Sequence, residues 1–155
     1  MDQQALQARL DALRADSGVP GATAAVMRGD EVVEAASGVL DVETGRPVTT
    51  DTLFHLASVT KVYTATLVMT LVDEGRIDLD VPITTYLPTF SVPDPDAAKS
   101  LTMRHLLTHT SGIDGDKFDS FGRGDDALEQ YVESCSTIGQ VHPVGATWSY
   151  CNSGL

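Results

Sequence analysis

The chain has 155 residues, of which 42% are hydrophobic and 21% charged, and its formal net charge is −12 at pH 7. This length suits one ordinary domain that buries roughly 68 to 70% of its unfolded surface, and the composition excludes an intrinsically disordered chain. The acidic charge and the lack of any Lys/Arg cluster argue against nucleic acid or an anionic membrane surface as a partner.

The N-terminal third predicts a helix followed by a β-hairpin. Leucines at positions 6, 10 and 13 recur at helical spacing within residues 2–16. Two β-prone runs, residues 22–27 and 31–39, then flank the turn-forming tripeptide Arg28-Gly29-Asp30. The first residues lack the basic region and apolar core of a secretory signal, so a cytoplasmic location is the default expectation.

The middle of the chain predicts a buried helix. Residues 62–72 are almost entirely apolar and end before Gly75, which is a typical helix stop. Threonines 64, 66 and 70 interrupt the run too often for a membrane span.

The remainder is predicted to be helix-rich and punctuated by loops. Proline-containing residues 78–88 read as turns and residues 91–100 as an exposed loop. Thr102 caps a predicted helix over residues 103–109, and a further helix is expected over residues 127–135. A helix, a hairpin and a helical remainder together predict an α+β fold.

Ser58 and Lys61 form the first candidate site. Residues three apart on a helix share one face, so this hydroxyl and this amine are expected side by side where the 62–72 helix begins. The positive helix N-terminus and the ammonium both favour an alkoxide, and a desolvated lysine can act as a base. By itself, however, the pattern favours a helix-capping serine beside a solvated lysine.

Tyr150 and Asn152 form the second candidate site, near the end of the chain. In an extended segment, residues two apart point to the same side, so the phenol and the amide can face one cleft. A tyrosine beside a cation can relay a proton, and an asparagine can orient a lysine or bind a substrate amide.

Other residues suggest sites that the chemistry does not support. His105 and His109 have the spacing of a zinc-protease helix, but the glutamate that should follow the first histidine is a leucine, so a packing or surface role is expected. Cys135 and Cys151 are too few for a disulfide framework and match no zinc motif, so we expect no metal or other cofactor. A nucleophilic Cys151 paired with His142 is less plausible than a small space-filling residue.

Taken together, three stretches resemble the superfamily of serine β-lactamases and penicillin-binding proteins. The resemblance is closest to the branch with class C β-lactamases, D-alanyl-D-alanine carboxypeptidases and esterases. The stretches are Phe54-His55-Leu56-Ala57-Ser58-Val59-Thr60-Lys61, Leu106-Leu107-Thr108-His109-Thr110-Ser111-Gly112-Ile113 and Pro143-x-Gly145-x-x-Trp148-x-Tyr150-Cys151-Asn152-Ser153-Gly154.

The resemblance implies a fold and a set of roles. The fold is the β-lactamase/transpeptidase type, with residues 1–57 in its α/β part and residues 58–155 forming the nucleophile helix and the helical domain. Ser58 would be the acylated nucleophile, Lys61 its activator, Tyr150 the general base and acid, and Asn152 a substrate-binding residue. The substrate would be a small molecule or peptide with a carbonyl centre: an amide, a β-lactam or an ester.

One motif of this family is absent from the sequence. Family members carry a third motif, Lys or His followed by Ser or Thr and then Gly, and no such triplet occurs in this sequence. We therefore expect an N-terminal portion of a longer protein, inactive or nearly so unless a second chain completes the fold. The alternative is a non-catalytic protein of the same fold that binds peptides or partner proteins.

Overall fold

The computed structural model describes residues 2–155 and divides into two compact units, one ending at His55 and the other spanning Leu56–Leu155. The predicted boundary after residue 57 lies two residues from this division. The assignment of residues 1–57 to the α/β part and of residues 58–155 to the nucleophile helix and helical domain stays a prediction. Each unit is described by itself below.

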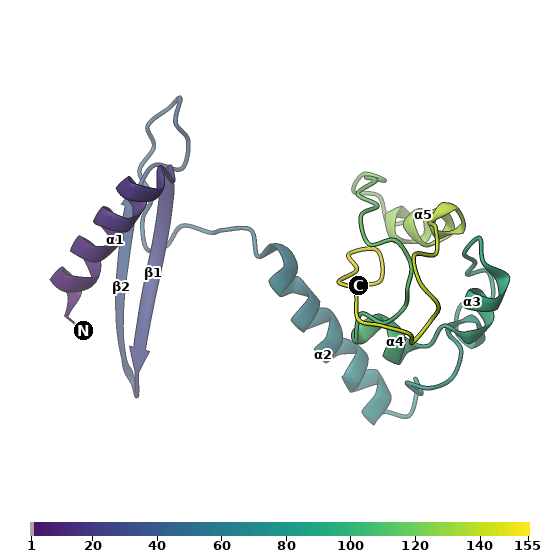
Figure 1. The fold of residues 1–155 in the computed structure, drawn as a ribbon. Helices are drawn as coiled ribbons and strands as arrows, with labels where there is room; N and C mark the ends of the chain where they lie inside the picture. Colours follow the sequence, from purple (N-terminus) through teal and green to yellow (C-terminus); the bar gives the residue numbers. More distant parts are fainter. Residues whose placement is uncertain (1) are drawn as a thin grey trace. The chain divides into compact units, whose positions relative to one another are not determined.

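The first unit contains the predicted helix and hairpin (Figure 1). Helix α1 (Gln3–Ser17) is capped by the side chain of Asp2, and the chain leaves the helix through Gly18 at φ 64°. Strands β1 (Gly21–Arg28) and β2 (Glu31–Gly38) pair antiparallel, which confirms the predicted hairpin.

Helix α1 packs on strand β2 through both apolar and polar contacts. Leu6 and Ala35 are buried, and Arg14 Nε donates to Ser37 Oγ at 2.7 Å. The first unit thus consists of one helix packed on a two-stranded sheet.

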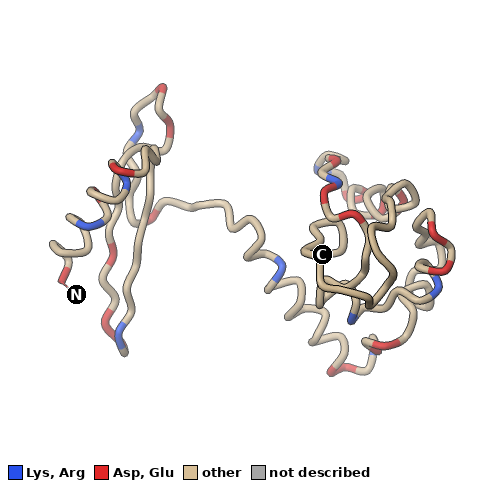
Figure 2. The backbone as a smooth tube through the Cα atoms, in the orientation of Figure 1, with Lys and Arg blue, Asp and Glu red and all other residues tan. Residues whose placement is uncertain are grey.

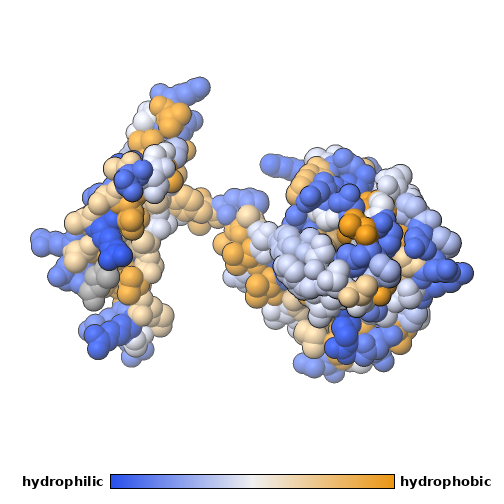
Figure 3. Space-filling view, viewed as in Figure 1, coloured by the Kyte–Doolittle hydropathy of each residue, from blue (hydrophilic) through white to orange (hydrophobic). Residues whose placement is uncertain are grey.

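Helix α2 (Thr60–Asp73) opens the second unit after a short 3₁₀ turn, Ala57–Val59. Its predicted burial is wrong: none of its residues is buried, and Val62 and Leu67 are 65% and 63% exposed. A helix that is apolar on every side needs cover on every side, and no such cover surrounds α2 in the second unit. Figure 3 shows apolar side chains along this exposed helix.

The core of the second unit is built from loops and short helices rather than from α2. Helix α5 (Ala127–Ser134) and a 3₁₀ turn (Cys135–Thr137) flank it. The buried cluster consists of Val92, Ala97, Ile113, Cys135, Ile138 and Cys151.

Helix α3 (Pro95–Ser100) corrects the prediction of an exposed loop over residues 91–100. Asp94 caps the helix and Pro95 occupies its first turn, a pairing that begins helices as readily as it makes loops. Val92 and Ala97 are buried against the core, so this segment is structural.

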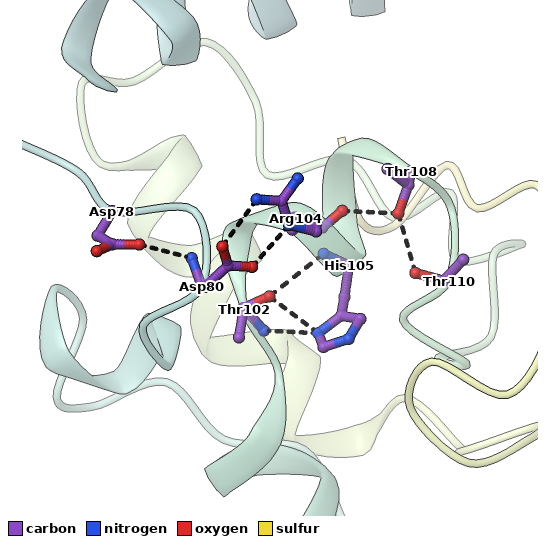
Figure 4. Close-up of polar contacts among 7 residues, drawn as sticks. All are labelled: Asp78, Asp80, Thr102, Arg104, His105, Thr108 and Thr110. Carbon is purple, nitrogen blue, oxygen red and sulfur yellow. Dashed lines mark hydrogen bonds and ion pairs between the residues drawn. The ribbon is translucent and has the colours of Figure 1, made fainter. Parts of the chain in front are cut away.

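Helix α4 (Met103–Leu107) is fixed at its start by side chains (Figure 4). Thr102 and His105 form a capping box, and the Arg104 guanidinium binds both carboxylate oxygens of Asp80 at 2.6 and 2.7 Å. The helix ends two residues before its predicted limit, because His109 adopts a left-handed backbone with φ 56°.

Charge is spread over both units (Figure 2). Within residues 2–155, no group of three or more His, Cys, Asp or Glu side chains could hold a metal ion. The helices of this same stretch are too short or too polar to cross a bilayer.

Candidate active site

The structure brings all four predicted site residues together, from two segments of the second unit. Tyr150 Oη donates to Ser58 Oγ at 2.7 Å, and Lys61 Nζ donates to the same oxygen at 3.3 Å. Lys61 Nζ also donates to Asn152 Oδ1 at 2.8 Å. Ser58 is therefore contacted from the helix side by an ammonium and from the loop side by a phenol.

Ser58 lies in the 3₁₀ turn, with α2 beginning at Thr60. The preceding residue, Ala57, has φ 47°, a conformation that a residue with a Cβ rarely adopts. This sharp entry exposes the serine at the start of the helix, and strained backbone of this kind is concentrated at functional sites.

Lys61 links the other three side chains. Besides its two hydrogen bonds, its Nζ lies 4.9 Å from the centroid of the Tyr150 ring, within the range of a cation–π contact. The ammonium thus holds the amide of Asn152 on one side and the phenol on the other. This placement fixes the relative positions of Ser58 and the loop that carries Tyr150 and Asn152.

Tyr150 is electrostatically prepared to lose its proton. A hydrogen bond from Lys61 is the largest cause that lowers the pKa of the Tyr150 phenol, and the hydrogen bond with Ser58 lowers it further. The side chain is 42% exposed, so the phenol can also meet an incoming substrate. A phenolate stabilised in this way can accept the proton of Ser58.

The loop that carries Tyr150 and Asn152 is anchored by the residue between them. Cys151 is 2% exposed and belongs to the core, while its two neighbours point to the site, which agrees with the expected alternation. Burial raises the pKa of the Cys151 thiol, so a nucleophilic role with His142 has no support.

Gly115 allows the core to approach this loop closely. The N–H of Asn152 donates to the carbonyl of Gly115 at 3.1 Å. A Cβ at position 115 would lie 2.8 Å from the carbonyl oxygen of Tyr150 and 2.9 Å from Cys151 Cα. Only glycine fits there without moving the loop.

His109 is the residue at this site that the sequence reasoning missed. Its ring lies 4.7 Å from the Tyr150 ring, and its Nδ1 accepts the N–H of Cys151 at 3.2 Å. His105, by contrast, serves the cap of α4. Since His109 and Cys151 are 42 positions apart, no local pattern could have indicated their contact.

Comparison with known proteins gives consistent matches. The family model described as "Beta-lactamase" matches residues 6–155. The chain is 49% identical over 148 residues to "Penicillin-binding protein 4" of Amycolatopsis lactamdurans, covering 96% of this chain and 39% of that protein. It is 44% identical over 119 residues to "Esterase EstB" of Burkholderia gladioli, covering 73% of this chain and 30% of the esterase.

A solved structure matches over nearly the whole chain. The D-amino acid amidase from Ochrobactrum anthropi SV3, complexed with D-phenylalanine, superposes with a TM-score of 0.76 at 32% identity. The match covers 97% of this chain and 41% of the amidase, so the chain spans well under half the length of these similar proteins. The predicted β-lactamase/transpeptidase-like fold is confirmed.

Proposed function

The chain belongs to the beta-lactamase family, and on that premise we propose that the protein is a serine hydrolase that works through an acyl-enzyme on an amide, β-lactam or ester. The observation that carries the proposal is the double contact on Ser58 Oγ, from Lys61 Nζ at 3.3 Å and from Tyr150 Oη at 2.7 Å. A nucleophile and a base within hydrogen-bond reach, with a third group orienting the base, is the arrangement that covalent catalysis requires.

In the acylation step, the Tyr150 phenolate takes the proton of Ser58 as Oγ bonds to the substrate carbonyl carbon. The carbonyl electron pair moves onto its oxygen, and the backbone N–H of Ser58 is one donor for that oxyanion. When the tetrahedral intermediate collapses, the bond to the leaving group breaks. Tyr150 then returns its proton to the departing nitrogen or oxygen.

In the deacylation step, Tyr150 removes a proton from water, and the resulting hydroxide attacks the acyl ester. The ester bond to Ser58 Oγ breaks, and this oxygen recovers the proton from Tyr150. Lys61 donates to Ser58 and Asn152, and its hydrogen bond with Tyr150 lowers the pKa of the phenol, which favours the phenolate in both steps.

The names of the similar proteins support acyl transfer but span three substrate classes. One is named a penicillin-binding protein, one an esterase and one a D-amino acid amidase. All three activities require attack on a carbonyl carbon, so we propose that common step for this protein. The amide of Asn152 is in place to bind an amide group of the substrate, since its Nδ2 donors are separate from the oxygen that Lys61 holds.

Mass spectrometry of the longest natural form of the protein tests this proposal. After incubation with a fluorophosphonate and, separately, a β-lactam, we expect a covalent adduct on the peptide that contains Ser58. Ser58→Ala should remove the adduct, and Lys61→Met should slow its formation. Absence of any adduct on the folded protein with either reagent would instead favour a non-catalytic binding protein.

For the 155-residue chain by itself, we propose little or no turnover. A single oxyanion donor, the Ser58 N–H, can be assigned within residues 2–155, and loss of one such donor typically costs ~10²–10³ in rate. Hydrolysis of an ester or β-lactam by the purified chain at the rate of an intact family enzyme would contradict this.

A further inference from the structure

His109 contacts the Tyr150 loop on both sides of the tyrosine. Its backbone oxygen accepts the N–H of Ser149 at 2.8 Å, and its Nδ1 accepts the N–H of Cys151 at 3.2 Å. These are the residues immediately before and after Tyr150. One histidine therefore fixes the backbone that carries the phenol at two successive points.

The ring of His109 completes the support. It lies against the Tyr150 ring with 4.7 Å between centroids and is T-shaped to the Trp148 ring with 6.1 Å between centroids. Tyr150 is 42% exposed, and its hydroxyl contacts Ser58 while its ring faces the Lys61 ammonium. The Tyr150 ring is thus contacted by both the His109 ring and the Lys61 ammonium.

His109 makes these contacts from a backbone conformation that is energetically unfavourable for a residue with a Cβ. Its φ of 56° lies in the left-handed region, where histidine, asparagine and aspartate occur more often than other residues with a Cβ. Backbone of this kind persists only when its surroundings enforce it. Here the hydrogen bond from the His109 N–H to the Leu106 carbonyl and the two hydrogen bonds to the loop hold it.

We infer that His109 is a positioning residue that holds the Tyr150 phenol in line with Ser58, an inference that rests on the proposed serine hydrolase function. It acts mainly through the hydrogen bond from Cys151, to which the ring contact adds a smaller part, rather than by touching substrate. A misplacement of about 1 Å at a reacting group can cost roughly 10²-fold in rate, so loss of this support should appear in acylation.

The support depends on the protonation state of the imidazole. An Nδ1 that accepts a hydrogen bond must be unprotonated, so the neutral ring carries its proton on Nε2. Burial lowers the pKa of His109, and the nearby Lys61 ammonium lowers it further. Lys61 from α2 and Tyr150 from the loop are the ionisable side chains that the ring faces.

Two substitutions separate the side chain of His109 from its backbone. His109→Asn and His109→Gly both tolerate a positive φ, so neither adds backbone strain. Asparagine keeps an acceptor at the same number of bonds from Cβ as Nδ1, whereas glycine offers none. The pair therefore isolates the hydrogen bond to Cys151.

The test measures the rate of fluorophosphonate labelling of Ser58 in the longest natural form, per folded molecule. We expect His109→Gly to slow labelling roughly 10- to 100-fold, and His109→Asn to recover most of the lost rate. In the wild type, labelling should also fall as acid protonates His109. This component of the pH profile should be absent from His109→Asn.

The outcomes are distinguishable. If the wild type does not label at Ser58, the proposed function fails. If the wild type labels and His109→Gly labels at the same rate, the function stands and the positioning role is overturned. Equal slowing in both variants, with unchanged pH profiles, would also overturn it, since it would show that the acceptor is irrelevant.

Discussion

The two halves of the candidate site are positioned by different physical means. Ser58 lies in the 3₁₀ turn that leads into α2 and Lys61 in the first turn of α2, so local backbone structure fixes their spacing within one short stretch of sequence. Tyr150 and Asn152 stand on an irregular loop that depends on the buried Cys151, on Gly115 and on other distant contacts. The helix half of the site, Ser58 and Lys61, is positioned by local backbone structure. The loop half, Tyr150 and Asn152, is positioned by tertiary packing.

This difference implies that the two halves respond differently to mutation. Changes in the core should move the loop half and leave the spacing of Ser58 and Lys61 intact. Changes on the exposed surface of α2 should leave both halves in place. Substitutions of Tyr150, Lys61, Gly115 and Val62 should therefore differ widely in effect, with the largest loss at Tyr150 and the smallest at Val62.

Tyr150→Phe removes the proposed base but keeps the ring that contacts His109 and Lys61. We expect acylation of Ser58 to fall about 10²- to 10⁴-fold, the usual contribution of a general acid–base group. The labelling rate of the longest natural form measures this, with thermal unfolding as the control for the fold. Labelling at the wild-type rate would assign the base to another group.

Lys61→Met tests the electrostatic link between the two halves. Removing the cation removes the largest cause that lowers the Tyr150 pKa, so this pKa should rise. Since the phenolate is the proposed base, the pH at which the labelling rate reaches half its alkaline plateau should move upward. A profile that keeps its midpoint would show that Lys61 does not tune the tyrosine.

Gly115→Ala tests the loop half through the core. The added Cβ would lie 2.8 Å from the backbone oxygen of Tyr150, which is too close. Such overpacking typically lowers the free energy of unfolding by ~1–3 kcal/mol. Chemical denaturation measures this. Gly139→Ala is the matched control, because its Cβ would meet nothing within 4 Å, and it should behave as wild type.

Val62→Ala tests the exposed surface of α2 and should have the smallest effect. Val62 is 65% exposed, so truncation should change the free energy of unfolding of the 155-residue chain by no more than about 0.5 kcal/mol. A loss well above 1 kcal/mol in denaturant titrations would mean that something covers this helix in solution.

The same contrast explains what the sequence could predict. Periodicity and turn residues were sufficient for α1, the β1–β2 hairpin and α5, because these elements are specified within a few residues. The Ser58–Lys61 pairing follows from helical spacing alone. Its partners, Tyr150 and Asn152, followed from strand-like alternation and a family resemblance, because no local rule reaches across ninety positions.

The failures were of tertiary origin. Hydrophobicity along 62–72 predicted burial of α2, but the pattern of a helix cannot specify what covers it. The prolines of residues 91–100 indicated a loop, although Asp94 and Pro95 in fact start a helix. The hydrogen bond between His109 and Cys151 could not be predicted either, since it exists only in the folded chain.

The rate at which a reagent modifies the Cys151 thiol reports how often the loop that carries Tyr150 and Asn152 opens. Its thiol is shielded from solvent and its pKa is raised by burial, so a thiol reagent can reach it only when the loop detaches from the core. Cys135, equally shielded in the same cluster, supplies the internal reference. The ratio of their modification rates therefore reports whether Tyr150 and Asn152 open as a separate unit or only when the whole core unfolds.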